Sequence, residues 1–129
     1  MKDMMTEDAV IVTDAGFAPA ETLPAHDLAS DATADDLAAA LHADVVRIAF
    51  PSFADGRGFT LARRLRQMGF TGHLRATGHV LADQYAMVRR SGFDDVQISA
   101  DLAARQPQDQ WRARANWRDH DYRSRLRGA

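Results

Sequence analysis

Apolar positions along the chain follow two alternating periodicities. Short apolar runs have the two-residue period of a strand, and between them apolar residues recur three or four positions apart, as on one helix face. Strands are predicted at residues 9–13, 26–30, 45–50, 73–77 and 95–99. Helices are predicted at about 34–42, from about Leu61 to Met68, from about Leu81 to Arg90 and from Pro107 to about Trp117. Residues 15–25 and 52–58 contain Gly or Pro and are predicted to be a turn with an irregular linker and a loop.

The helix ends carry recognisable signals. Thr33 followed by Asp36 resembles a capping box at the start of the first helix. Met68-Gly69-Phe70 and Ser91-Gly92-Phe93 repeat one pattern, in which a left-handed glycine ends a helix and an apolar residue packs back on its last turn. A strand is predicted after each exit. Such alternation of strand and helix implies parallel strands with right-handed crossovers.

The two faces of the predicted strands differ in polarity. One face carries apolar side chains, at Val46, Ile48, Phe50, Leu74, Ala76, Val96 and Ile98. The other carries Arg47, Arg75, Thr77, Gln97 and Ser99. A parallel sheet covered by helices on both faces has continuous apolar strands instead. We therefore predict a small α/β domain of repeated β-α units, mostly parallel, resembling part of a barrel with one polar face. A flavodoxin-like three-layer fold is the alternative.

Length and composition bound the organisation of the molecule. The 129 residues suit one domain, with a variable N-terminal segment at about 1–33 and a basic, aromatic C-terminal arm at about 107–129. Ala is abundant, whereas Leu, Ile, Val and Phe together supply only 26 residues. The core should therefore be small, and we expect a homodimer that completes it. The sequence has no Cys, no apolar run long enough for a bilayer and no apolar run in residues 1–8. We expect no disulfide, membrane contact or signal peptide, and a cytoplasmic location.

The net charge of −2 hides a strong asymmetry. Residues 1–55 hold two basic and eleven acidic side chains, whereas residues 56–129 hold fourteen basic and seven acidic ones. The acidic and basic parts could neutralise each other, within one subunit or between subunits. Alternatively, the arginine-rich part could bind an anion, because the guanidinium group suits carboxylates and phosphates.

Candidate chemistry lies where parallel strands end, because ligands of such folds bind beyond the carboxyl ends of the strands. These ends are predicted at Asp14, 52–58, 77–79 and 99–101. The loop that contains Asp55, Gly56, Arg57 and Gly58 opens a helix, so its backbone N–H groups and Arg57 could hold an anion. The loop lacks the Lys-Ser/Thr pair of a phosphate-binding loop. In the simpler interpretation, Asp55 caps the helix, the glycines form the turn and Arg57 pairs with a nearby carboxylate.

His79 is the candidate proton-transfer residue, with Asp83 four positions later as its orienting carboxylate. A surface histidine is the simpler interpretation, since no nucleophile is identifiable nearby. The other histidines lack metal-ligand spacing, and a site at Asp119-His120-Asp121 is not expected, so we predict no metal and no cofactor.

The C-terminal arm interleaves aromatic and basic residues from Trp111 to Arg127. Such a pattern can bind single-stranded nucleic acid. However, Asp109, Asp119 and Asp121 dilute its charge. We therefore expect a docking arm that lays its aromatic side chains on another surface, and no nucleic-acid binding.

Three ordered blocks carry a family resemblance: FPSFADGRGFTLARRLR at 50–66, LRATGHVLADQ at 74–84 and GFD at 92–94. Over residues 45–98 the chain resembles a bacterial family of unknown function, often encoded beside assimilatory sulfite reductase and labelled as sulfite-reduction oxidoreductases. The family pattern usually has Asp where this chain has His79 and often Cys where it has Ser91. The lack of Cys excludes thiol-based redox chemistry.

The resemblance points to positions that match the family pattern: Asp55, Gly56, Arg57, Gly58, Arg75, Gly78, Asp83 and Gln84. It implies an accessory protein of sulfate or sulfite reduction that binds a protein partner, such as sulfite reductase, or a small anion. The alternative is an enzyme acting on a small anionic substrate. In that case Asp55, Asp83 or His79 would transfer protons, and Arg57 and Arg75 would hold the anion.

Overall fold

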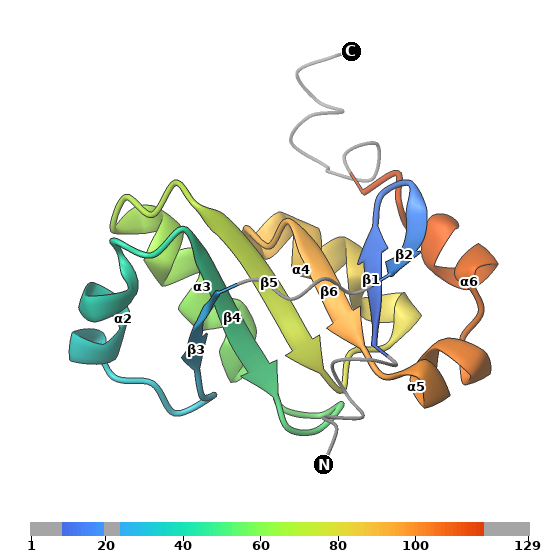
Figure 1. Ribbon diagram of the computed structural model, residues 1–129, viewed down its shortest axis with the longest axis horizontal. Coiled ribbons are helices and arrows are strands. Elements are labelled where there is room, and N and C mark those ends of the chain that lie inside the picture. Colours follow the sequence, from blue (N-terminus) through green and yellow to red (C-terminus); the bar gives the residue numbers. More distant parts are fainter. Residues whose placement is uncertain (1–8, 20–23, 118–129) are drawn as a thin grey trace.

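A computed structural model describes residues 9–19 and 24–117 (Figure 1). Its strands are β1 (Val10–Thr13), β2 (Gly16–Pro19), β3 (His26–Leu28), β4 (Val45–Phe50), β5 (His73–Gly78) and β6 (Asp95–Ile98). Its helices are α2 (Ala34–Ala40), α3 (Arg57–Gln67), the 3₁₀ helix η1 (Ala82–Gln84), α4 (Tyr85–Ser91), α5 (Ala100–Arg105) and α6 (Gln108–Arg112).

The strands form one open sheet in the order β2-β1-β6-β5-β4-β3. Strands β3 to β6 are parallel, whereas β1 pairs antiparallel with both β6 and β2. The prediction of a small α/β domain with a mostly parallel sheet is confirmed, and the sheet is open.

The connections between the parallel strands all advance in one direction, from β3 to β4 to β5 to β6. Right-handed crossovers then place α2, α3 and α4 on one side of the sheet. Figure 1 shows α3 and α4 behind the sheet and no described helix in front of it. The three-layer alternative, which needs helices on both faces, is therefore not the fold of the described residues.

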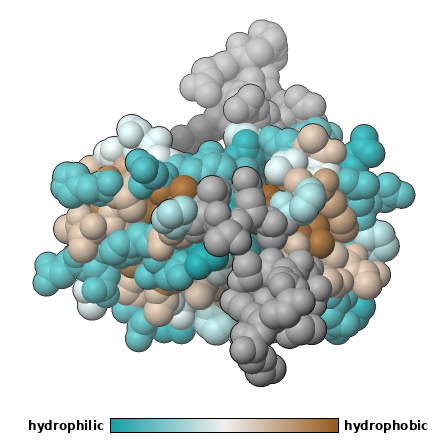
Figure 2. All heavy atoms as spheres, in the orientation of Figure 1, coloured by the Kyte–Doolittle hydropathy of each residue, from teal (hydrophilic) through white to brown (hydrophobic). Residues whose placement is uncertain are grey.

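The core lies between the sheet and these helices. Val46, Ile48 and Phe50 are buried there with side chains from the helices, which include Leu37, Ala62, Leu65, Tyr85 and Val88. The opposite face is polar along β4 and β5, as the alternation predicts. Arg47 pairs with Asp27, and Arg75 pairs with Asp95. Figure 2 views this side and shows hydrophilic residues over much of its described surface.

The predicted helix ends are confirmed. Thr33 and Asp36 form the capping box, and Gly69 and Gly92 adopt positive φ angles of 102° and 114°. Arg66 links the two helix ends that carry these glycines, because its guanidinium donates to the carbonyls of Phe70, Gly72 and Gly92. The repeated sequence pattern therefore marks two helix ends that one arginine holds together.

Several sequence predictions were wrong in detail. The predicted linker contains β2, because Thr13 and Gly16 close a tight turn that returns the chain along β1. The helix predicted from Leu81 begins instead as η1. Pro107 is an N-cap outside α6, which ends at Arg112. Helix α5 was missed, although Ser99 caps it by accepting a hydrogen bond from the Leu102 N–H. No described helix is long and apolar enough to cross a membrane.

Candidate ligand pocket at the carboxyl edge of the sheet

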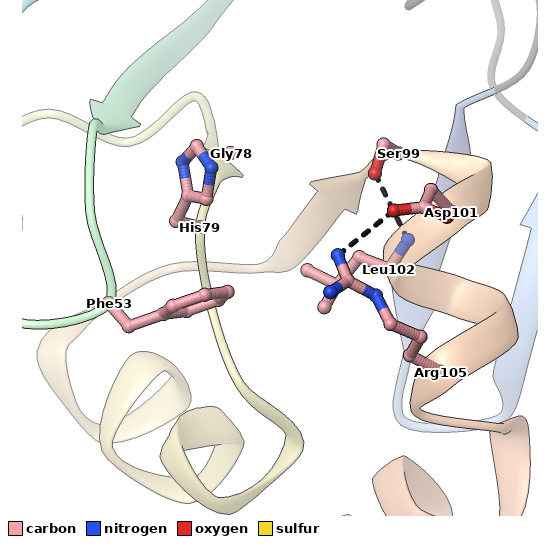
Figure 3. A pocket seen from close by; sticks show the side chains of 7 residues that line it. All are labelled: Phe53, Gly78, His79, Ser99, Asp101, Leu102 and Arg105. Carbon is pink, nitrogen blue, oxygen red and sulfur yellow. Dashed lines mark hydrogen bonds and ion pairs between the residues drawn. The ribbon is translucent and has the colours of Figure 1, made fainter.

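The parallel register brings the carboxyl ends of β4, β5 and β6 to one edge of the sheet. A cavity of about 240 Å³ lies there, among the segments that follow these strands. It is lined by Phe53, Gly78, His79, Ser99, Asp101, Leu102 and Arg105. Figure 3 shows Phe53 and His79 on one side and the residues of α5 on the other. The cavity thus lies at the edge predicted by the rule that ligands bind beyond the carboxyl ends of parallel strands, here called the strand-end rule.

The β5 side of the cavity is fixed by contact with the end of β4. Gly78 has a φ of 106°, and a Cβ atom there would lie 2.7 Å from the Phe50 carbonyl oxygen. The next residue, His79, donates its backbone N–H to the same oxygen over 2.9 Å. The His79 Nδ1 atom lies 3.3 Å from that oxygen, which can only accept, so the contact assigns the proton to Nδ1. Nε2 of the neutral ring is then an acceptor with no partner among the described side chains.

The opposite side is the first part of α5. Ser99 Oγ accepts the Leu102 N–H over 3.1 Å, which leaves its own O–H able to donate. Arg105 Nη2 lies 2.9 Å from Asp101 Oδ2, and these side chains are 67% and 81% exposed. An ion pair this exposed contributes little stability, so Arg105 can exchange Asp101 for another anion at small cost.

Phe53 adds an aromatic wall. Its ring meets that of His79 edge to face, with centroids 5.2 Å apart, and its side chain is 38% exposed. Gln84 braces this wall, because its Nε2 donates to the Phe53 carbonyl over 3.1 Å while its Oε1 accepts the Leu81 N–H over 2.8 Å. The predicted residue Gln84 thus supports the cavity from behind without lining it.

Asp55 and Arg57 face each other rather than the cavity. Arg57 Nε and Nη2 donate to the two Asp55 carboxylate oxygens over 3.0 and 2.8 Å, and Nη2 also donates to Ser30. Asp55 accepts the Arg57 backbone N–H as well. Hydrogen bonds from the Arg57 side chain and backbone lower the pKa of Asp55 to about 2. The pairing of Arg57 with a nearby carboxylate is that of the simpler interpretation. The expectation that Asp55 caps the helix was wrong, because the N-cap of α3 is Gly56 and no side chain caps it.

The two glycines of this loop differ. A Cβ on Gly58 would lie 2.5 Å from Phe50 Cζ, so this glycine lets the start of α3 pack onto the buried ring. A Cβ on Gly56 would make only an ordinary contact with Phe59. Neither glycine lines the cavity.

Two further predicted residues lie away from the cavity. Arg75 is 4% exposed on the polar face of β5, where its Nε and Nη2 donate to Asp95 over 2.8 and 3.0 Å. Asp95 also contacts His73 Nε2 at 2.9 Å. Asp83 pairs with Arg114 over 2.8 Å on the surface and makes no hydrogen bond to His79. Of the three proton-transfer candidates, only His79 lines the cavity.

Asp14 was placed at the wrong edge by the strand-end rule, because β1 runs antiparallel to β6. There Tyr85 Oη donates to Asp14 over 2.5 Å, and Arg89 Nε and Nη2 donate to it over 3.1 Å each. Burial raises the pKa of Asp14, but the hydrogen bonds from Tyr85 and Arg89 outweigh burial and leave it below its ordinary value. Burial, followed by the contact with Asp14, raises the pKa of Tyr85.

The described part of the C-terminal arm packs on its own domain. Trp111 is 1% exposed and meets Tyr85 edge to face, with ring centroids 6.1 Å apart. The guanidinium carbon of Arg89 lies 4.9 Å from the Trp117 ring centroid. Residues 118–129, with Asp119-His120-Asp121 and the remaining arginines of the arm, lie outside the described residues.

Leu102 and Arg105 were not predicted to line the cavity, because no helix was predicted directly after β6. A signal was present, since Ser99 is a favoured N-cap and Leu102-Ala103 supplies an apolar pair one turn later. Among the described residues, no group of three or more His, Asp or Glu side chains could hold a metal ion.

The fold and the cavity define a class: a small open-sheet α/β domain with a pocket at the carboxyl edge of its parallel strands. The chain belongs to a bacterial family of unknown function, DUF934, whose model matches residues 25–127. The family resemblance in the sequence is thereby confirmed. Comparisons with curated proteins and with solved structures each find no match.

Proposed function

We propose that the protein binds a small oxyanion, such as sulfite or sulfate, in the pocket at the carboxyl edge and serves as an accessory protein of sulfite reduction. The observation that carries the proposal is the position of Arg105, a mostly exposed guanidinium on the wall of the cavity whose described ion-pair partner is the still more exposed Asp101. The link to sulfite reduction comes from the resemblance of the sequence to a family often encoded beside sulfite reductase.

The cavity offers complementary donors from two directions. Arg105 supplies a charged fork, Ser99 supplies a hydroxyl, and His79 faces them across the cavity and gains a second donor when it is protonated. An oxyanion has several acceptor oxygens and no donors, so it matches such a set. Because Asp101 competes for Arg105, we expect weak, reversible binding.

Titration calorimetry with sulfite and with sulfate tests the proposal through two opposite effects. Arg105→Ala should weaken binding about 10- to 100-fold, because a charge-assisted contact is lost. Asp101→Asn should tighten binding, because it removes the competing carboxylate. Arg112→Ala, which removes an exposed arginine outside the cavity, should leave the affinity unchanged. Equal affinity in all four proteins, or no binding to the wild type, would contradict the proposal.

A second experiment separates binding from catalysis. Purified sulfite reductase is assayed for turnover with the wild-type protein, with the Arg105→Ala variant and without either. An accessory role predicts a change of turnover that depends on Arg105. If the protein is instead an enzyme, it should consume the anion without sulfite reductase. The His79→Gln variant should then lose turnover, because His79 is the predicted acid/base residue that lines the cavity.

A further inference from the structure

The helix-covered face of the molecule carries opposite charges on neighbouring helices. The crossovers place α2 between β3 and β4 and place α3 between β4 and β5, so the two helices are successive elements of one layer. Figure 1 shows α2 at the β3 side of the sheet and α3 next to it, behind β4. The charge asymmetry of the sequence therefore becomes a boundary between two adjacent helices.

Helix α3 is the basic side of this boundary. Arg63 and Arg64 are exposed, and neither forms an ion pair with a described residue. No Asp or Glu occurs between residues 56 and 82, so no nearby carboxylate in the sequence reduces the charge. Met68, just after the helix, is 40% exposed and adds apolar area. An exposed methionine beside unpaired cations is typical of a contact surface.

Helix α2 and the turn before it form the acidic side. Asp31, Asp35 and Asp36 are exposed. Asp36 takes part in the capping box with Thr33, and the pKa of Arg57 at the start of α3 is raised by its hydrogen bond to Asp55 and then by the charge of Asp31. No Lys or Arg occurs between residues 3 and 46. Ala38 and Ala39 are exposed on the same helix and present small side chains that allow a close approach. Within the described residues, no ion pair joins α2 to α3, and Asp35 has no ion-pair partner there.

We propose that α2 and α3 form the interface between two copies of this chain. A two-fold axis between the two helices places the acidic α2 of each copy against the basic α3 of the other, so one rotation satisfies both contacts. Such complementarity selects the partner and fixes its orientation. A second copy suits this surface better than an unrelated acidic protein, because this chain itself carries the complementary charge beside the basic one.

Sedimentation velocity on the full chain at low and high salt tests the interface. Wild type should dimerise at low salt and dissociate as salt screens the charges. The variant R63E/R64E reverses the charge of two exposed arginines of α3, and the variant D31K/D35K reverses the charge of two of the three aspartates on the acidic side. Each should be monomeric, with a dissociation constant raised about 100-fold or more by like-charge contacts. The control R112E/R114E makes the same charge change outside this face and should behave as wild type.

Mixing the two monomeric variants provides the decisive measurement. Their charges are complementary at both contacts, so an equimolar mixture should restore a dimer that contains one copy of each. Circular dichroism checks that each variant is folded. If only one variant folds, that variant is mixed with wild type instead. A wild type that stays monomeric at low salt, a dimer that survives R63E/R64E, or a mixture that stays monomeric would overturn the proposal.

Discussion

The two ends of the parallel strands use the same kinds of side chain in opposite ways. At the amino end, a network made by Arg66, His73, Arg75, Asp94 and Asp95 satisfies its polar groups internally. Arg66 donates to three backbone carbonyls and to Asp94, and Asp94 also accepts the Leu74 N–H. At the carboxyl end, Arg105 lies in the cavity wall with one exposed partner.

This difference separates residues that hold the fold from residues that are available to a ligand. A buried polar group left without its partner costs its full desolvation penalty, so the buried Arg75–Asp95 pair of this network must remain complete. An exposed pair costs little to break, so the carboxyl end can change partners. Substitution of the amino-end arginines should therefore cost more free energy of unfolding than substitution of Arg105.

The largest loss is expected for Arg75→Ala, which leaves the Asp95 carboxylate buried without its bidentate partner. Arg75 and Asp95 side chains are 4% and 6% exposed, so the loss should be about 3–5 kcal/mol. Urea unfolding followed by tryptophan fluorescence measures it. Arg112→Ala, which removes an exposed arginine outside the proposed interface, should change stability by less than about 0.5 kcal/mol. Similar losses in the two variants would show that the pair is not structural.

A smaller loss is expected for Arg66→Ala, because this side chain is partly exposed and water can replace some of its bonds. The carbonyls of Phe70, Gly72 and Gly92 would lose their donor together, at a cost of about 1–3 kcal/mol. Arg66→Lys should recover little of the lost free energy of unfolding, since one ammonium group cannot reach the several acceptors that a planar guanidinium spans. Full recovery by lysine in the same unfolding assay would mean that charge alone matters.

The sequence predicted the parallel units well because their signals are local. Residues 45–50 and 73–77 have strand periodicity, and the repeated glycine exits define the helix ends between them. The sequence failed to predict features that depend on how distant segments pair in space. Nothing in the residues 9–13 shows that β1 runs antiparallel, so Asp14 was assigned to the wrong edge.

The candidate site was predicted in part for the same reason. Parallel strands bring Phe53, Gly78, His79 and Ser99 to one edge, and strand periodicity alone locates those ends. The pairing of Asp55 with Arg57 and of Arg75 with Asp95 depends on side-chain directions across turns and strands. A sequence shows that such residues carry opposite charges but not that they satisfy each other.

The Asp55–Arg57 pair gives a pH-dependent prediction for the carboxyl end. The pKa of Asp55 is lowered from 3.8 to about 2 by the Arg57 hydrogen bonds, so the folded state prefers the ionised carboxylate. Its contribution to stability is complete above pH 3.8 and is lost as the pH falls toward 2. Carboxyl NMR titration should find a midpoint near 2 in the wild type and one closer to 3.8 in Arg57→Ala. An unchanged midpoint in the variant would show that Arg57 does not hold Asp55.

The smallest effect on stability is expected at the pocket itself. Arg105→Ala and Asp101→Asn alter an ion pair that is mostly exposed, so each should change the free energy of unfolding by less than about 0.5 kcal/mol. Gly78→Ala, also at the cavity wall, is the matched contrast, because its Cβ would meet the Phe50 carbonyl at a positive φ and should destabilise the fold. Urea unfolding of the three variants distinguishes cavity residues that hold the fold from cavity residues that are available to a ligand. If Arg105→Ala destabilised the protein as much as Gly78→Ala, Arg105 would belong with the structural arginines of the amino end, and the pocket would lose its available cation.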